Sequence, residues 1–431
     1  MRGQSPSELP GAGIPQLPFG FRLSRRLVFH PPSSILHPRL GTSAALVALL
    51  LAAALARAGD ARPVRPPPAP GLLYTNQHVG SVPWSIHVVK VPLGRLPYEI
   101  HSLHARGKAL GLSTLSAQAA SINPALGQPV AGLNGDFYKR DKAYAGAPRG
   151  LQISEGELLS SPSGGPSFWV DALGEVHAAN VTSLFRVTWP DGTSSPFGLN
   201  NERRLNQLEL YTPAIGPSTL TAGGRELVLE RGESKEWLPL RPDRTYAARV
   251  RQVRESGNAP VAPDLMVLAV PPALVSRLQS IQPGAVLQIS TGCLPNLRGI
   301  RTAISGGPVL LREGQRQKIR ASPTDSFEFS SMIERHPRAA LAWNSTSLFL
   351  VEVDGRQRDL SVGMTLDELS KYLASLGCQD ALNLDGGGSA TLWWQGEVRN
   401  SPCDHYERPI ANSVVIVRKN PSHAASNPGH N

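Results

Sequence analysis

After residue 75 the chain alternates short runs of hydrophobic residues with glycine, proline and polar residues. Short runs rich in Val, Ile, Leu and aromatic residues, bounded by such turn formers, are typical of β-strands. The strands predicted from this pattern are Trp84–Val91, Ala131–Asn134, Ser167–Val170, Leu208–Tyr211, Leu227–Leu229, Leu265–Ala269, Val286–Ile289, Val309–Leu311, Ser347–Val353, Ala381–Leu384, Ala390–Trp394 and Ser413–Val417. We therefore predict a β-rich chain with few helices.

One segment, Thr365–Leu376, has the pattern of an amphipathic helix, because leucines recur in it at spacings of three and four residues. Thr365 and Glu368 have the spacing of a capping box, in which each side chain bonds a backbone N–H of the first turn. Gly377 can take the left-handed conformation that ends many helices. These features predict where this helix begins and ends.

The helix lies between two predicted strands, Ser347–Val353 and Ala381–Leu384. This order predicts a β-α-β unit with parallel strands and a right-handed crossover. The loop that leaves the second strand, Asp385–Ser389, then opens at the carboxyl edge of the sheet, where ligands usually bind. The predicted fold class is α+β, with β-rich mixed sheets, few helices and one β-α-β unit that carries this Gly-rich active-site loop.

Three consecutive glycines stand between Asp385 and Ser389. Glycine allows backbone N–H groups to approach a ligand closely, and such a run can form an anion-binding nest. A strand is predicted after the loop where nucleotide-binding loops have a helix, which argues against a dinucleotide site or a P-loop. An ordinary hairpin turn would explain the same glycines.

The composition agrees with a folded, turn-rich chain. Of 431 residues, 41 are glycine and 39 are proline, which favours turns and strands over long helices. Hydrophobic residues make up 41% and charged residues 18%, which excludes a wholly disordered or coiled-coil protein.

The N-terminal residues predict export. The uncharged apolar run 44–56 follows arginines and precedes small residues, as in a secretory signal peptide. A retained anchor is the alternative, although the run is shorter than the ~20 residues that a membrane-spanning helix needs. We predict an N-terminal extension and signal peptide at 1–58, a Pro-rich linker at 59–74, one domain at 75–420 and a disordered tail at 421–431. The expected location is periplasmic or extracellular, with membrane contact only through export or an uncleaved anchor.

The net charge of +10 is unevenly distributed. Residues 1–70 contain eight arginines, no lysine and two acidic residues, which is +6 and leaves +4 for residues 71–431. The domain is therefore only mildly basic, and we expect no nucleic-acid partner.

Three cysteines, Cys293, Cys378 and Cys403, are too few for a disulfide scaffold and lack the spacing of a zinc site. The pattern leaves two readings open, a bridge between Cys378 and Cys403 or free buried thiols. No paired His or Asp ligand spacing is present either, so we predict no metal and no cofactor.

Several segments carry a family signature. They are Val353–Gln357, Ser361–Leu366 and Asp380–Ser389, together with Asn134–Tyr138, Asn206–Pro213, Ile304–Leu310 and His336–Arg338. In this order they resemble the phosphodiester glycosidase family over about residues 75–420. The resemblance implies a hydrolase that cleaves the C1–O bond of a sugar-1-phosphodiester. The family's animal member removes N-acetylglucosamine from a phosphodiester link to mannose, and bacterial members are associated with exopolysaccharide.

The substrate class implied by the resemblance sets chemical demands. A phosphodiester is a good leaving group and needs little protonation as it departs. The enzyme mainly has to stabilise the anion that develops, a task that suits arginine and backbone N–H groups. The oxocarbenium-like transition state at C1 favours one carboxylate close by and a second group that activates water. The predicted partner is therefore a phosphorylated glycan or sugar-1-phosphodiester.

The candidate site residues follow from the motifs and the resemblance. The catalytic candidates are Asp385 and Asp136. The substrate-binding candidates are Asn134, Arg338, Arg408, Gly306, Gly307, Gly386, Gly387, Gly388 and Ser389. Each has a structural alternative: Asp385 can cap its own loop, Arg338 can form a structural ion pair, and the glycines can serve packing alone.

Two other functions stay open at this point. An exported glycan-binding protein without catalysis would keep the glycines but would not need both carboxylates and Arg338. A metal-dependent phosphodiesterase that cuts the P–O bond would need clustered Asp and His ligands.

Overall fold

Strands pair into three sheets and a closed barrel in the computed structural model, which describes residues 71–94, 97–105, 109–140, 142–320 and 330–420. The predicted signal peptide at 1–58, the linker up to residue 70 and the tail at 421–431 lie outside the described residues. Strand β1 (Leu73–Val79) includes the last two residues of the predicted linker. The β-rich fold with few helices, predicted from the sequence, is confirmed.

The largest sheet has seven strands and carries the β-α-β unit. In spatial order they are β1, β2 (Trp84–Pro92), β20 (Ser347–Val353), β19 (Arg338–Trp343), β21 (Asp380–Asn383), β17 (Val309–Arg312) and β18 (Gln315–Arg316). Strand β19 lies between β20 and β21 and is antiparallel to both, so β20 and β21 are parallel, as predicted, without being neighbours.

The helix of the unit, α5 (Leu366–Ser375), has the predicted ends. The Thr365 hydroxyl accepts a hydrogen bond from the Glu368 N–H at 3.1 Å, and the Glu368 carboxylate accepts one from the Thr365 N–H at 2.9 Å. Gly377 follows the helix with φ of 79°. The leucine face packs on the seven-stranded sheet, in a core with residues of β17 and β20.

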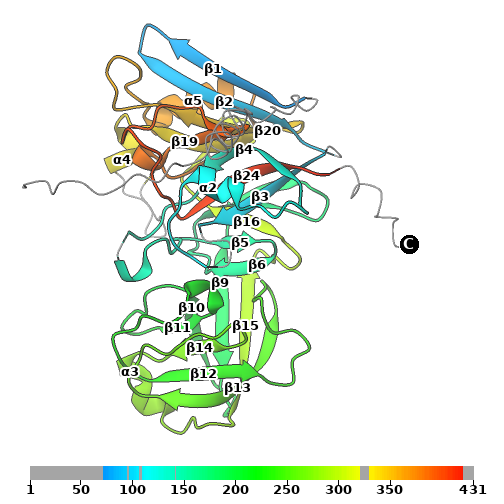
Figure 1. Cartoon of the computed structure of the whole chain (residues 1–431), viewed down its shortest axis with the longest axis vertical. Helices are drawn as coiled ribbons and strands as arrows, with labels where there is room; N and C mark the ends of the chain where they lie inside the picture. Colours follow the sequence, from blue (N-terminus) through cyan, green and yellow to red (C-terminus); the bar gives the residue numbers. More distant parts are fainter. Residues whose placement is uncertain (1–70, 95–96, 106–108, 141, 321–329, 421–431) are drawn as a thin grey trace, which may run out of the picture. The chain divides into compact units, whose positions relative to one another are not determined.

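A five-stranded sheet packs against the opposite face of the seven-stranded sheet. Its strands in order are β23 (Glu397–Val398), β22 (Leu392–Trp394), β4 (Gln128–Asn134), β24 (Asn412–Arg418) and β3 (Tyr98–His104). The short helix α2 (Leu115–Ala120) covers its outer face. The layers are therefore helix α5, the seven-stranded sheet, the five-stranded sheet and helix α2 (Figure 1). The loop after β21 meets the end of β4, where the Asn134 side chain donates to the Asp385 carbonyl.

The remaining strands form a smaller sheet and the barrel. The smaller sheet contains β6 (Glu157–Ser160), β5 (Gln152–Ser154), β16 (Thr302–Ser305), β7 (Pro166–Val170) and β8 (Val176–Asn180). The barrel contains β10 (Ser194–Leu199), β11 (Leu208–Tyr211), β14 (Met266–Ala269), β12 (Glu226–Arg231), β13 (Thr245–Arg254), β15 (Val286–Leu294) and β9 (Thr182–Thr188). The pattern predicted several of these strands, but not their closure into a barrel.

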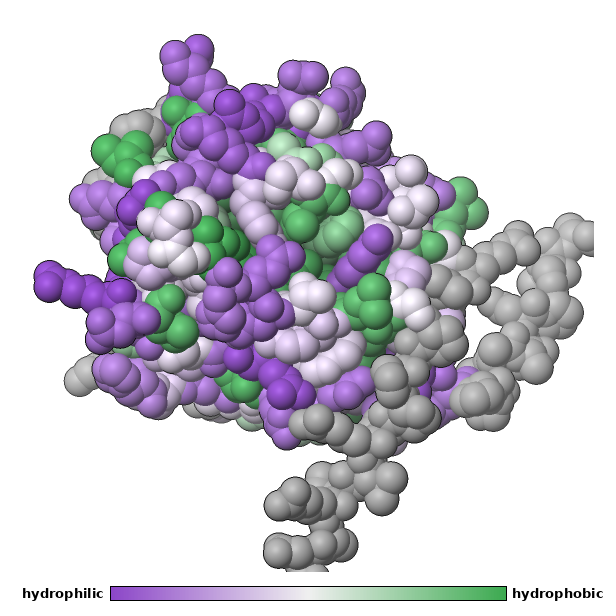
Figure 2. Space-filling model, turned by 90° about the horizontal axis from the view of Figure 1, so that it is seen from above, coloured by the Kyte–Doolittle hydropathy of each residue, from purple (hydrophilic) through white to green (hydrophobic). Residues whose placement is uncertain are grey.

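The other helices are short. They are α3 (Pro272–Val275), α4 (Ser330–Ile333) and the 3₁₀ turns Lys142–Tyr144, Pro213–Ile215, Ser276–Leu278 and Gly387–Ser389. In the part of the chain that the structure describes, no helix is long and apolar enough to cross a membrane. Hydrophobic side chains on the face shown in Figure 2 are scattered among hydrophilic ones.

The three cysteines are free, so the possible bridge between Cys378 and Cys403 is not formed. Cys378 is buried in the core beneath α5, whereas Cys403 is only partly buried, on a loop beside Arg356. Burial raises the pKa of the Cys378 thiol to about 12.

Candidate active site

A cavity of about 440 Å³ opens beside the Gly-rich loop that follows β21. Its walls come from segments far apart in the sequence: the loop after β4, the turn before β19, the loop after β20 and the segment before β24. The lining residues used below are Arg140, Arg149, His336, Arg338, Arg356, Asp385, Gly386, Gly387, Gly388 and Arg408. The β-α-β unit therefore places this loop at a concave site, as predicted.

Asp385 is the carboxylate among the described residues that line this cavity. Its backbone N–H donates to the Gly135 carbonyl at 3.0 Å, which ties the loop to the end of β4. Burial raises the pKa of Asp385, while Ser389 and the arginines Arg408 and Arg140 lower it. The pKa of this carboxyl is raised overall, because Ser389 and the two arginines offset only part of the cost of burial.

Asp136 lies deeper, only 2% exposed, in the loop that leaves β4. Its Oδ1 accepts a hydrogen bond from the Phe137 N–H at 2.7 Å, and its own N–H donates to the Asn412 side chain at 2.8 Å. Burial, together with the negative charge of Asp385, raises the pKa of Asp136 to about 7. The two predicted carboxylates therefore interact electrostatically, because the negative charge of Asp385 disfavours ionisation of Asp136.

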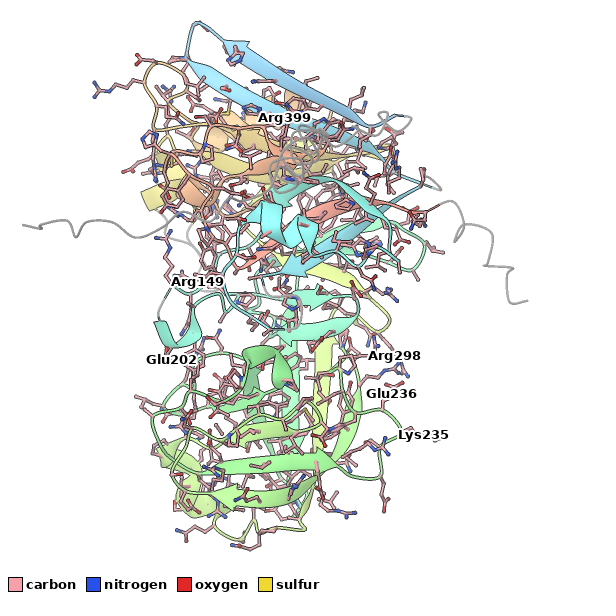
Figure 3. All side chains as sticks on the ribbon, viewed as in Figure 1. Arg149, Glu202, Lys235, Glu236, Arg298 and Arg399 are labelled. Atoms are coloured by element: carbon pink, nitrogen blue, oxygen red, sulfur yellow. The ribbon has the colours of Figure 1, made fainter. Side chains whose placement is uncertain are left out.

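Five arginines surround the cavity: Arg140, Arg149, Arg338, Arg356 and Arg408. Arg149 stands on the loop before β5 (Figure 3). Against five guanidinium groups the lining contributes one carboxylate, so the cavity attracts anions. This electrostatic character is what a phosphate group requires.

Arg356 and Arg408 flank the glycines directly. A Cβ on Gly387 would lie 3.2 Å from Arg356 Nη2, and one on Gly388 would overlap the Arg408 guanidinium. Gly387 also has φ of +60°, which favours glycine. The glycines thus leave room for two cations against the loop, a role that the nest hypothesis did not include.

Hydrogen bonds inside the fold occupy several of the loop's N–H groups. The Gly387 N–H donates to the Pro337 carbonyl at 2.9 Å, and the Ser389 N–H donates to the Gly386 carbonyl at 3.2 Å. These two groups are not available to an anion. Recognition of an anion here falls mainly to the arginine side chains.

Arg338 begins β19 and is 5% exposed. Its Nε donates to the Met364 carbonyl, and its Nη2 donates to the carbonyls of Ser331 and Glu334, each at 2.7 Å. Burial, followed by the charge of Arg356, lowers the pKa of Arg338 to about 10. This guanidinium lines the cavity while holding together the backbone around it.

Asn134 is 1% exposed and fixes the loop. Its Nδ2 donates to the Asp385 carbonyl at 2.6 Å, and its Oδ1 accepts from the Thr391 N–H at 3.0 Å. Gly306 and Gly307 pack against β21, where a Cβ on Gly306 would lie 2.5 Å from the Asn383 carbonyl oxygen. The structure places these three beside the site, outside the cavity lining, and Ser389 is buried under Asp385.

The sequence reasoning did not assign a role to three of the arginines. Arg356 lies inside the quoted motif Val353–Gln357. Its position there, directly after Asp354-Gly355, is the sequence signal that could have marked it as a site residue. Arg140 and Arg149 stand in loops without a motif of their own. His336, the first residue of the quoted motif His336–Arg338, lines the cavity, with Nδ1 3.3 Å from Arg356 Nη2 and Nε2 3.3 Å from Glu334.

Comparisons with solved structures bear on the fold. A hypothetical protein from Synechocystis aligns with a TM-score of 0.63 and 19% identity, over 80% of this chain and 62% of that one. A protein from Burkholderia pseudomallei K96243, whose name marks export as its expected location, aligns with a TM-score of 0.58 and 21% identity, over 78% of this chain and 74% of that one. At these identities the likeness concerns the fold alone.

Sequence comparisons bear on the family. N-acetylglucosamine-1-phosphodiester alpha-N-acetylglucosaminidase from Bos taurus is 32% identical over 112 residues, which is 25% of this chain and 20% of the relative. The uncharacterized SPbeta prophage-derived protein YomE from Bacillus subtilis is 35% identical over 83 residues, 19% of this chain and 13% of that protein. The chain thus spans a fifth or less of these curated relatives.

The family model described as phosphodiester glycosidase matches residues 263–417, a shorter span than the predicted 75–420. The matched span contains Arg338, Arg356, Asp385 and Arg408, whereas Asp136 lies outside it. The resemblance predicted from the sequence is thus confirmed over residues 263–417, the span of this chain that matches the phosphodiester glycosidase family.

Proposed function

We propose that this protein hydrolyses the glycosidic C1–O bond of a sugar-1-phosphodiester. The family match supports a hydrolase of the glycosidase type. The observation that carries the finer proposal is the cavity itself, in which five guanidinium groups surround a lining carboxylate, Asp385. Arginines receive the phosphodiester leaving group, while the carboxylate stabilises positive charge at C1.

The two carboxylates have different environments, which suits different roles. Asp385 lines the cavity near Arg408 and Arg140, whose charges favour its ionised form, and is the group that we place against C1. Asp136 lies behind it, with a pKa raised by burial to about 7. We infer that Asp136 exchanges a proton with groups in the cavity when a water molecule attacks C1.

The proposed substrate belongs to an envelope or extracellular polysaccharide, outside the cytoplasm. The apolar run 44–56, which follows arginines, supports export. The expected location given by the name of the Burkholderia pseudomallei neighbour agrees with this proposal.

Replacement of Asp385 by Asn should lower turnover of an N-acetylglucosamine-1-phosphodiester by at least ~10²-fold, the scale of one positioned catalytic group. Circular dichroism and the unfolding midpoint should stay close to wild type. Asp359→Asn is the matched control, because Asp359 is exposed and does not line the cavity. Near-normal turnover of Asp385→Asn would remove Asp385 from the mechanism.

Asp136 should make stability depend on pH. Its folded pKa of about 7 lies above the unfolded value of about 3.9, so the folded state binds the extra proton and its stability falls as pH rises from about 4 to about 7. Between pH 5 and pH 8 wild type should lose about 2 to 3 kcal/mol relative to Asp136→Asn. Urea unfolding at both pH values measures this difference, and parallel pH profiles for the two proteins would contradict it.

Replacement of Arg356 by Ala should raise KM at least ~10-fold for a phosphodiester substrate, because a charged hydrogen-bond donor is lost. Hydrolysis of an aryl glycoside without phosphate should change little. Arg358→Ala is the control, since Arg358 is exposed and lies outside the lining. Arg338→Lys should impair both substrates alike, because Arg338 also holds backbone carbonyls. Equal effects of Arg356→Ala on both substrates would assign Arg356 a structural role.

The bond that breaks can be identified in ¹⁸O-labelled water. Cleavage of C1–O puts the label on the released sugar, whereas cleavage of P–O puts it on the phosphate. We expect the label in the sugar, read by mass spectrometry. Label in the phosphate would establish a phosphodiesterase instead.

A further inference from the structure

A cluster of three potential metal ligands lies away from the cavity. His87 on β2 and Glu352 on β20 are cross-strand partners, and Asp354 follows directly after the end of β20, two residues beyond Glu352. One ligand atom from each residue lies within 4.8 Å of the others. The three residues are 2%, 0% and 1% exposed.

Glu352 is the unusual member of this cluster. It projects from the same strand face as Leu348 and Leu350, into the core between the two large sheets. Neither of its carboxylate oxygens accepts a hydrogen bond of ordinary geometry, although Asn400 lies close by. A buried carboxylate without a partner is strongly destabilising, and the negative charge of Asp354 beside it adds to the cost. A cation beside the carboxylates, or a proton on Glu352, removes this cost.

No described side chain supplies a positive charge directly to Glu352. His87 Nε2 lies 3.0 Å from Asp354 Oδ2. The guanidinium of Arg399 (Figure 3) lies over the Tyr74 ring, 5.6 Å from its centre, and its Nη1 is 3.0 Å from Glu397. Among the described residues, the imidazole of His87 is thus the one potential cation beside the carboxylates of Glu352 and Asp354.

Neighbouring groups orient the three ligands. The Tyr74 hydroxyl lies 2.8 Å from His87 Nδ1, which leaves Nε2 facing the carboxylates. The Ser401 N–H donates to Asp354 Oδ1 at 2.7 Å. Such outer hydrogen bonds fix the ring orientation of metal-binding histidines and the direction of metal-binding carboxylates.

We propose that His87, Glu352 and Asp354 bind a divalent transition-metal ion of the Zn²⁺ type, as a structural site between the two large sheets. One imidazole nitrogen and two carboxylate oxygens suit Zn²⁺, whereas Ca²⁺ prefers six to eight oxygen ligands. The Ser85 hydroxyl, 3.2 Å from His87 Nε2, or a water molecule completes four-coordination. The ion would join β2 to β20 and, through the Asp354–Ser401 hydrogen bond, the segment that carries Cys403 beside Arg356. None of the three ligands lines the cavity, so the ion takes no part in bond cleavage.

The test uses the full chain after dialysis against a chelator. Titration calorimetry with Zn²⁺ should show one equivalent bound, the unfolding temperature should rise on Zn²⁺ addition, and Co²⁺ should give the visible absorption of a four-coordinate ion. Glu352→Gln should weaken Zn²⁺ binding by ~10-fold to 100-fold or more. It should also abolish the rise of the unfolding temperature on Zn²⁺ addition. His177→Gln is the control, because His177 pairs with Asp171 in a partly exposed His–Asp pair at 2.8 Å elsewhere.

Folded, chelator-treated wild type that binds neither Zn²⁺ nor Co²⁺ stoichiometrically would overturn the proposal. So would a Glu352→Gln variant that binds Zn²⁺ as wild type does. If that variant fails to fold, the titrations of wild type decide alone. These measurements do not involve substrate, so they are independent of the proposed hydrolysis.

Discussion

Burial of strand β20 on both faces is the constraint on which the rest of the structure depends. All seven of its residues are buried. Its side chains point alternately into the core between the two large sheets and into the core beneath α5. A strand covered on both sides needs a partner strand on each edge, and β2 and β19 provide them. Because β19 then pairs with β21, the loop that begins at Asp385 is fixed at the sheet end.

The same burial explains the chemistry of the carboxylates near this end. Removal of water raises the pKa of both Asp136 and Asp385. Two arginines of the cavity, Arg408 and Arg140, oppose the rise at Asp385, whereas one, Arg149, opposes it at Asp136. A position deep in the fold therefore favours a proton holder, whereas a position at the cavity wall favours an ion. The different roles that we propose for the two carboxylates rest on this difference in depth.

Burial has the opposite consequence at Glu352. The leucines of β20 on the same face gain stability from the core, whereas a carboxylate there loses its hydration. At the cavity, arginines and backbone N–H groups offset this loss for Asp385 and Asp136. Around Glu352 the described residues offer one imidazole and a second carboxylate. This contrast is why we interpret the cluster as a cation site and the cavity as an anion site.

The sequence by itself determined the predicted strands, helix α5 with its capping box, the parallel direction of β20 and β21, and the loop at Asp385, because periodicity, capping and turn formation act over a few residues. Tertiary structure decided which distant residues meet. The pairing of β2 with β20 puts His87 opposite Glu352, and packing gathers Arg140, Arg356 and Arg408 around one cavity. Such contacts join segments hundreds of residues apart, and no local pattern encodes them, since they depend on the register and stacking of whole sheets.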